Sequence, residues 1–214
     1  MRVARVTAIG CLVPAILSAG CFTLTNMKTG EVTPPGRLAF GLGATFLNED
    51  VVPVLEARFA PLPRWDLGLR WDYICMNLDT RLQIFADPAD GFDSALELGV
   101  GSSFGVLPRP YVYGGVAVSK CLGQWTPYFH YRYINVAYNN ELADEDNSFI
   151  AELLFYLPAE FHELGQISLG AEYRPGGKEG KFALLPEVLF CPSLTDDRGN
   201  ILTVFNLGLR FRLW

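Results

Sequence analysis

Apolar and polar side chains alternate strictly over residues 64–73, and this pattern constrains the fold more than any other feature of the chain. The segment reads R-W-D-L-G-L-R-W-D-Y, in which an apolar or aromatic residue recurs at every second position. Successive side chains of a β-strand point to opposite faces, so this spacing predicts a strand with one apolar and one polar face. The same split recurs along most of the chain and predicts an all-β protein.

Ten segments with this alternation are separated by turn-forming residues, such as those of Pro61–Pro63 and Gly176–Gly180. Their lengths suit a tilted strand that crosses a bilayer, which takes about 9–11 residues. An even number of strands is what single-chain bacterial barrels contain. We therefore predict a closed antiparallel up-and-down transmembrane β-barrel, with strands over about residues 37–47, 51–60, 64–74, 78–86, 92–104, 111–120, 126–138, 167–174, 182–190 and 201–214.

One long segment, residues 139–165, breaks the alternation. It begins with the acidic run NNELADEDN and continues with Phe149, Leu153 and Tyr156 at helical spacing, behind Ser148, a residue type common at helix N-caps. We expect an extracellular loop that carries a short helix. The alternative is a further hairpin in this segment, which would raise the number of strands to twelve.

The start of the chain has the organisation of a secretory leader. Two arginines precede a short apolar run, and small residues follow just before Cys21, so residues 1–20 are expected to be a signal peptide rather than a membrane-spanning helix. Residues 21–36 are polar and end in Pro-Pro-Gly, which predicts an N-terminal tether. The barrel itself is expected over residues 37–214.

The charge balance, the cysteines and the missing motifs each argue against a class of function or of structure. Without residues 1–20 the chain has 15 Lys and Arg against 23 Asp and Glu, a net charge of −8, which argues against nucleic acid as a partner. Besides Cys21, three cysteines remain in this part, so no disulfide framework can be inferred. The motifs HExxH, CxxC, GxSxG and the P-loop are absent from the sequence, so we expect no metal and no cofactor.

The identity of the charged residues predicts which face of the strands points inward. The polar faces carry arginine and acidic residues but no lysine, whereas a face in contact with water would include Lys, Thr and Gln. Arginine stays charged and binds carboxylates through two hydrogen bonds, which suits a paired interior. We expect a lumen network of Glu56, Arg58, Asp66, Arg70, Asp72, Asp79, Arg81, Asp93, Glu97, His130, Arg132, Glu172, Arg174, Glu187 and Arg210.

The opposite, apolar faces are expected to contact lipid. They consist of Leu, Val, Phe, Trp and Tyr, with aromatic residues near strand ends, as in the aromatic girdles of membrane barrels. The alternative is a water-soluble, lipocalin-like barrel, in which the apolar faces would point inward. In the membrane arrangement the lipid-facing residues include Trp65, Leu67, Leu69, Trp71, Phe129, Tyr131, Leu207, Leu209 and Phe211.

The residues around Cys21 resemble the lipobox of bacterial lipoproteins, because Ala-Gly precedes the cysteine. This resemblance implies that Cys21 is acylated, as by palmitate, and becomes the first residue of the mature chain. The chain as a whole resembles a family of small bacterial outer-membrane barrels that begin with a lipobox. The motifs that carry this resemblance are Cys21-Phe-Thr-Leu-Thr, Pro35-Gly, Phe40-Gly-Leu-Gly, Asp66-Leu-Gly-Leu-Arg, Thr126-Pro-Tyr with Tyr131-Arg-Tyr, Leu184-Leu-Pro-Glu and Leu207-Gly-Leu-Arg-Phe.

The resemblance implies an outer-membrane location with the lipid anchor on the periplasmic side, and it implies no agreed activity. From Phe205 to Leu213 apolar residues alternate, and the chain then ends on Trp214, which resembles the signal that the barrel-assembly machinery recognises. That machinery is therefore an expected partner during biogenesis, and outer-membrane lipids are the expected surroundings. The sequence indicates no other protein partner.

The expected architecture leads to one preferred function and two alternatives. A ten-stranded barrel has a narrow interior, and a charge-balanced network would close it rather than line a conducting pore. We therefore expect a structural or interaction role without enzymatic activity. The first alternative is a narrow porin or small-solute transporter. The second is an enzyme that modifies lipid A, which would need Ser, His and an acid on the lipid-facing wall, whereas His130 falls on the polar face.

Overall fold

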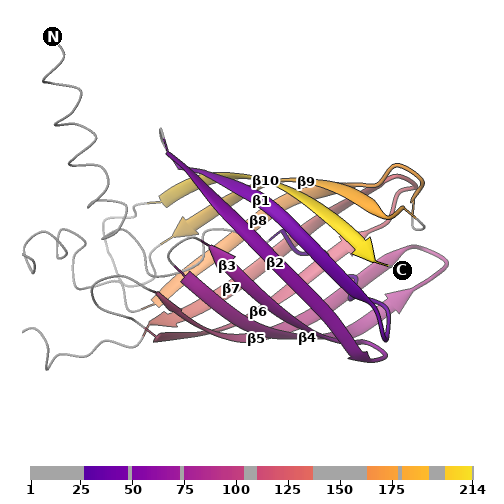
Figure 1. The fold of residues 1–214 in the computed structure, drawn as a ribbon, viewed down its shortest axis with the longest axis horizontal. Coiled ribbons are helices and arrows are strands. Elements are labelled where there is room, and N and C mark those ends of the chain that lie inside the picture. Colours follow the sequence, from indigo (N-terminus) through magenta and orange to yellow (C-terminus); the bar gives the residue numbers. More distant parts are fainter. Residues whose placement is uncertain are drawn as a thin grey trace, which may run out of the picture.

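The computed structural model describes residues 27–47, 50–72, 75–103, 110–136, 163–177, 180–192 and 201–213. These residues form ten strands, each antiparallel to its neighbours, and β1 also pairs with β10, so the sheet closes into a barrel (Figure 1). The predicted closed antiparallel barrel of ten strands is confirmed. The strands are β1 (Leu38–Leu47), β2 (Asp50–Leu62), β3 (Trp65–Asp72), β4 (Cys75–Asp87), β5 (Phe92–Ser103), β6 (Pro110–Lys120), β7 (Trp125–Val136), β8 (Glu163–Tyr173), β9 (Phe182–Pro192) and β10 (Ile201–Leu213).

The predicted loop helix falls on residues 148–161, which lie outside the described ranges. Within those ranges the structure has no helix that is both long and apolar enough to cross a membrane.

The two ends of the barrel differ. The connections β2–β3, β4–β5, β6–β7 and β8–β9 are turns at the end where β1 begins and β10 finishes; we call this the turn end and the opposite one the loop end (Figure 1). Gly91, Gly123 and Gly176 adopt left-handed backbone conformations in three of these turns. The fourth turn uses Arg64 with a φ of 65°, a conformation that is uncommon for a residue with a Cβ.

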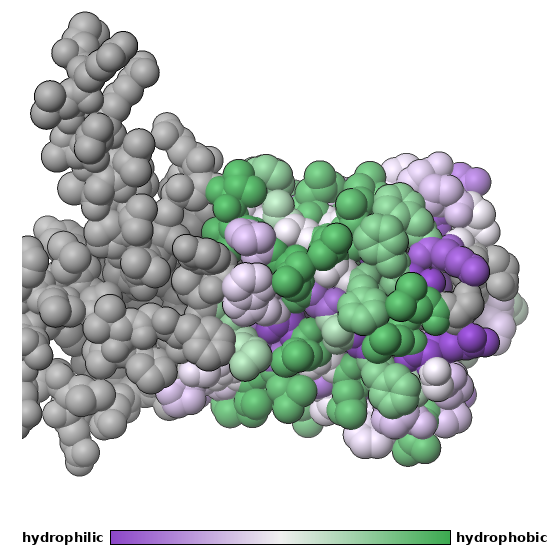
Figure 2. Space-filling model, in the orientation of Figure 1, coloured by the Kyte–Doolittle hydropathy of each residue, from purple (hydrophilic) through white to green (hydrophobic). Residues whose placement is uncertain are grey.

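Inward and outward faces alternate along the strands. In β3, Asp66 and Arg70 are buried, whereas Leu67 and Leu69 are 38% and 48% exposed. Figure 2 shows apolar side chains over much of the visible barrel wall and hydrophilic ones gathered at the right-hand, turn end. The apolar residues that a water-soluble barrel would enclose are therefore on the outer surface.

One irregularity interrupts this alternation in β4. The pairing of β4 with β5 shifts between Gln83 and Phe85, which is the signature of a β-bulge. As a result the adjacent residues Ile84 and Phe85 are both exposed on the outer wall.

Inside the barrel, tyrosine rings lie against glycines of the neighbouring strands. A Cβ on Gly99 would lie 2.6 Å from the hydroxyl oxygen of Tyr113, and Gly101 and Gly170 make similar room for tyrosines. Glycine in these strands therefore lets large side chains lie flat across the lumen wall, so that the narrow interior can be filled.

Candidate functional site

The inward faces form a continuous charged lumen. All fifteen residues predicted for the lumen network occupy inward positions; thirteen are buried, and Glu56 and Asp93 are partly exposed. Of the nine residues predicted to face lipid, Trp65, Tyr131 and Leu209 are half-buried and the other six are exposed. The lipid-attachment candidate, Cys21, lies outside the described residues.

One cluster of ion pairs is centred on Asp66, which is fully buried. One carboxylate oxygen accepts a hydrogen bond from Arg58 Nη2 at 2.7 Å, and the other accepts one from Arg81 Nη2 at 2.6 Å. The backbone N–H of Thr33 donates to the same carboxylate at 2.9 Å. Asp66 thus joins β2, β3 and β4 to a residue that belongs to no strand.

A second cluster surrounds Glu97 and Asp79 at mid-barrel. The Glu97 carboxylate lies 3.1 Å from Arg132 Nη2 and 3.0 Å from His130 Nε2, while Asp79 accepts a hydrogen bond from Arg58 at 2.6 Å. Lys28 donates to Asp79 at 2.7 Å and also to Glu97. This lysine therefore bridges two carboxylates of adjacent strands, each of which also has an arginine partner.

A third cluster lies at the turn end, around Glu172 and Glu31. Glu172 pairs with Arg174 and, at 3.1 Å, with Arg210, and Glu31 pairs with Arg174 and, at 3.1 Å, with Arg212. Burial would raise the pKa of Glu31, but the guanidinium groups of Arg212 and Arg174 outweigh it and lower this pKa to about 2. Glu31 is therefore an anion at neutral pH.

An important component of the lumen lies outside the strands, in residues 27–33, which the sequence pattern predicts to be part of a tether. Lys28 and Thr29 are completely buried, and Met27 and Thr33 are also buried. Lysine is absent from the expected network because the polar faces of the strand bodies carry none. Lys28 reaches the lumen from outside the strands. The polar faces of the strand bodies carry eight acids against seven arginines, the six of the expected network and Arg212, and this excess of one negative charge could have indicated a further cation.

These contacts define what the lumen can do chemically. The carboxylates of Asp66, Asp79, Glu97 and Glu172 are each bound by two or more cationic side chains, so they are poorly suited to proton transfer or to metal binding. In the described part of the chain, groups of three or more His, Cys, Asp or Glu that could hold a metal ion are absent. The arrangement is that of a cross-linked, neutralised interior.

The group of residues most similar to a catalytic triad is also inside the lumen. Ser168 of β8 faces His130 of β7 across the pair of strands, and Glu97 approaches the imidazole from β5. All three are buried, and neither imidazole nitrogen has a hydrogen bond of good geometry. A nucleophile activated by histidine also needs access for substrate, and all three of these side chains lie inside the barrel.

Comparisons with known proteins assign no family to this chain. No family model and no curated protein matches this sequence. The N-terminal β-barrel domain of Pseudomonas aeruginosa OprF is 10% identical, with 85% of this chain and 100% of that one covered and a TM-score of 0.36. LpxR from Salmonella typhimurium is 12% identical, with 87% and 78% covered and a TM-score of 0.46. PagL, an outer membrane enzyme, is 6% identical, with 82% and 98% covered and a TM-score of 0.39. Likeness at this level carries no inference about function.

Proposed function

We propose that this chain is an outer-membrane β-barrel lipoprotein with a closed lumen and a structural or interaction role. The observation that carries the proposal is the occupied lumen, in which ion pairs and residues 27–33 fill the interior. An interior of this kind stabilises the barrel and leaves its outer wall and loops for contacts with other molecules. The barrel-assembly machinery is the partner that we propose for insertion.

The outer wall supports a membrane location. Exposed Leu, Val, Ile, Phe, Met and Trp side chains occur on every strand, while most of the charged residues of the strands are buried inside. Water-soluble proteins seldom expose a continuous apolar surface of this extent. In lipid, by contrast, a closed barrel pairs its backbone groups between strands and presents an apolar exterior. Short turns are periplasmic in outer-membrane barrels, so we assign the turn end to the periplasm.

Conductance separates the closed barrel from the narrow-porin alternative. We expect the wild-type barrel, reconstituted in planar bilayers, to give no stepwise current, because buried ion pairs and a peptide segment occupy the lumen. A general diffusion porin reconstituted in parallel is the positive control. Reproducible single-channel steps from the wild-type barrel would contradict the proposal and favour the porin.

The position of His130 supports a role without lipid-modifying activity. This residue is completely buried in the lumen, while a lipid A substrate would approach from the outer wall. We expect the mass spectrum of lipid A from cells that overproduce the barrel to be unchanged. Loss or gain of an acyl chain in those cells, and its absence when an unrelated barrel is overproduced, would contradict this assignment.

We propose that the thiol of Cys21 is acylated. We expect a palmitate analogue fed to cells to label the wild-type protein and the variant Cys121→Ala but not the variant Cys21→Ala. Cys121 is a matched control, because it is a partly exposed thiol in a turn that lacks a preceding Ala-Gly. Label that persists in Cys21→Ala would contradict lipid attachment at this residue.

The side of the membrane on which this lipid lies follows from chain length. Met27 contacts the middle of the lumen, at Gly43 and Glu187, and a six-residue linker spans at most about 20 Å. Because residues 28–33 occupy the lumen between Met27 and the turn end, we propose the loop end for Cys21, in place of the periplasmic side that the lipobox resemblance implies. An epitope tag inserted after Phe22 should then bind antibody on intact cells; binding only after the outer membrane is opened would contradict this placement.

A further inference from the structure

The backbone of residues 27–33 is bound by side chains of the barrel wall. The N–H of Met27 donates to Glu187 at 2.6 Å, and its carbonyl oxygen accepts a hydrogen bond from Arg210 at 2.6 Å. Arg81 donates to the carbonyl oxygen of Thr29 at 3.0 Å, and the N–H of Gly30 donates to Ser119 at 3.0 Å. Main-chain hydrogen bonds of this kind hold an extended peptide in a protein groove.

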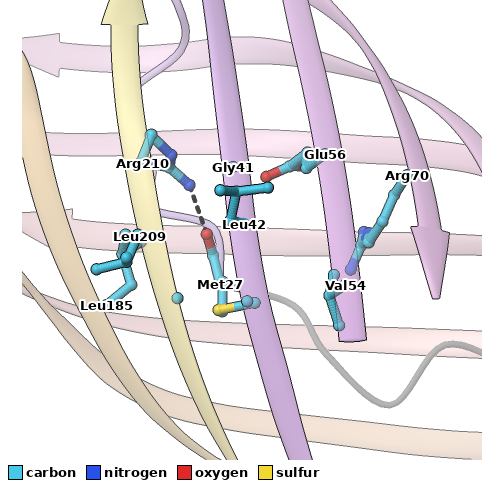
Figure 3. Close-up of a pocket in the computed structure, with 11 residues that line it drawn as sticks. Met27, Gly41, Leu42, Val54, Glu56, Arg70, Leu185, Leu209 and Arg210 are labelled. Atoms are coloured by element: carbon cyan, nitrogen blue, oxygen red, sulfur yellow. Dashed lines mark hydrogen bonds between the residues drawn. The ribbon is translucent and has the colours of Figure 1, made fainter. Parts of the chain in front are cut away.

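The side chain of Met27 occupies a gap that the wall leaves for it. A Cβ on Gly43 would lie 2.7 Å from the Met27 methyl group, and a Cβ on Gly208 would lie even closer to the sulfur. Val54 and Leu185 complete an apolar cluster around the thioether. Figure 3 shows Met27 beside β1 and β10, with Arg210 bound to its carbonyl oxygen.

The two charged side chains of the segment lie in sites of opposite charge. The ammonium group of Lys28 lies between the carboxylates of Asp79 and Glu97, and it is 0% exposed. Three residues later, Glu31 lies between the guanidinium groups of Arg174 and Arg212. This separation of charge along the lumen fixes the direction and the register in which the segment binds.

Of the two residues between Lys28 and Glu31, Gly30 must be glycine for a steric reason. A Cβ on Gly30 would lie 2.6 Å from the carbonyl carbon of Asp93 and closer still to its oxygen, and both are backbone atoms of β5. The wall therefore selects four of five consecutive positions by shape or by charge.

We propose that the lumen is a sequence-specific peptide-binding site for the pattern Met-Lys-x-Gly-Glu, which residues 27–31 occupy as an intramolecular ligand. The inference rests on the closed lumen proposed above and names what closes it. A free peptide with this pattern will bind the same site when the barrel's own copy is displaced.

Lysine reactivity tests the occupied state in the full-length barrel. In the wild type, an amine-acylating reagent should modify Lys28 at least about tenfold more slowly than the exposed residues Lys120 and Lys181, because reaction requires the segment to leave the lumen. The variant Gly30→Val should bring the reactivity of Lys28 to that of Lys120. Equal reactivity of Lys28 and Lys120 in the wild type would overturn the proposal, even if Gly30→Val fails to fold.

Peptide binding tests the specificity. A fluorescent peptide TNMKTGEVT, which copies residues 25–33, should bind the folded Gly30→Val barrel. The matched control TNMETGKVT has the same composition with the two charges exchanged, and it should bind about 100-fold more weakly, because each charge would meet its like in a buried site. The wild-type barrel should bind neither peptide.

The results of these experiments distinguish failure of the peptide site from failure of the closed lumen. Equal binding of both peptides, or no peptide binding by a Gly30→Val barrel whose Lys28 has become reactive, would overturn the peptide site. Channel currents from a wild-type barrel whose Lys28 is protected would overturn the closed lumen but leave the peptide site in place.

Discussion

Replacement of Asp66 by asparagine is expected to lower the free energy of unfolding of the barrel by about 3–5 kcal/mol. Asparagine keeps the size of the side chain but removes the charge that pairs with Arg58 and Arg81, both of which are buried. Arg58 would keep Asp79 and Glu56 as acceptors, whereas Arg81 would face a neutral amide in place of its carboxylate partner. Equilibrium unfolding in urea, with the barrel in lipid vesicles, measures the change.

The matched control is Asp90→Asn in the β4–β5 turn. Asp90 is exposed, so the same chemical change should alter the unfolding free energy by less than about 0.5 kcal/mol. If Asp66→Asn and Asp90→Asn shift the unfolding midpoint equally, Asp66 does not organise a buried network.

Replacement of Leu98 by arginine should cost about 2–4 kcal/mol of unfolding free energy in lipid, because an arginine would face the hydrocarbon near the middle of the membrane. Leu98 is 65% exposed and lies at the centre of β5, so the larger side chain meets no steric obstacle from the barrel. The same unfolding experiment in vesicles measures this loss.

Leu122→Arg provides the comparison for this second prediction. Leu122 is 57% exposed, but it lies in the β6–β7 turn at the turn end, where a charge costs about 0–1 kcal/mol. If Leu98→Arg leaves the free energy of unfolding unchanged, water surrounds the wall at Leu98, as in a soluble barrel. A large loss for both variants would mean that the turn also lies in the hydrocarbon.

The sequence predicted the number of strands because alternation is a local signal. It predicted their ends less well. β4 begins at Cys75, three residues before the expected start, and β8 begins at Glu163, four residues before it. In β8 the residues Gly165 and Gln166 interrupt the alternation of apolar and polar residues. Pairing of this region with β7 nevertheless extends the strand, since Asn135 faces Glu163. Pairing with a partner strand decides such ends, and a single segment does not carry that information.

The lumen was predictable only in part, for a related reason. Side chains of a strand point inward at every second position, so the arginine and acidic residues could be assigned to one face. Residues 27–36 have no period, and their contacts join them to residues as distant as Glu187 and Arg210. Lys28 illustrates the limit: an absence of lysine from strand bodies says nothing about a lysine that enters the lumen on another segment.

We infer that apolar side chains of the strands contact lipid while the polar faces enclose the lumen. Methyl NMR of the wild-type barrel in lipid nanodiscs tests this arrangement most directly. Magnetisation transfer from lipid acyl chains should reach the methyl groups of the exposed residues Leu67, Leu69 and Leu98, and should not reach those of the buried residues Leu185 and Leu189. Transfer to Leu185 and Leu189, with none to Leu67, Leu69 and Leu98, would contradict the account.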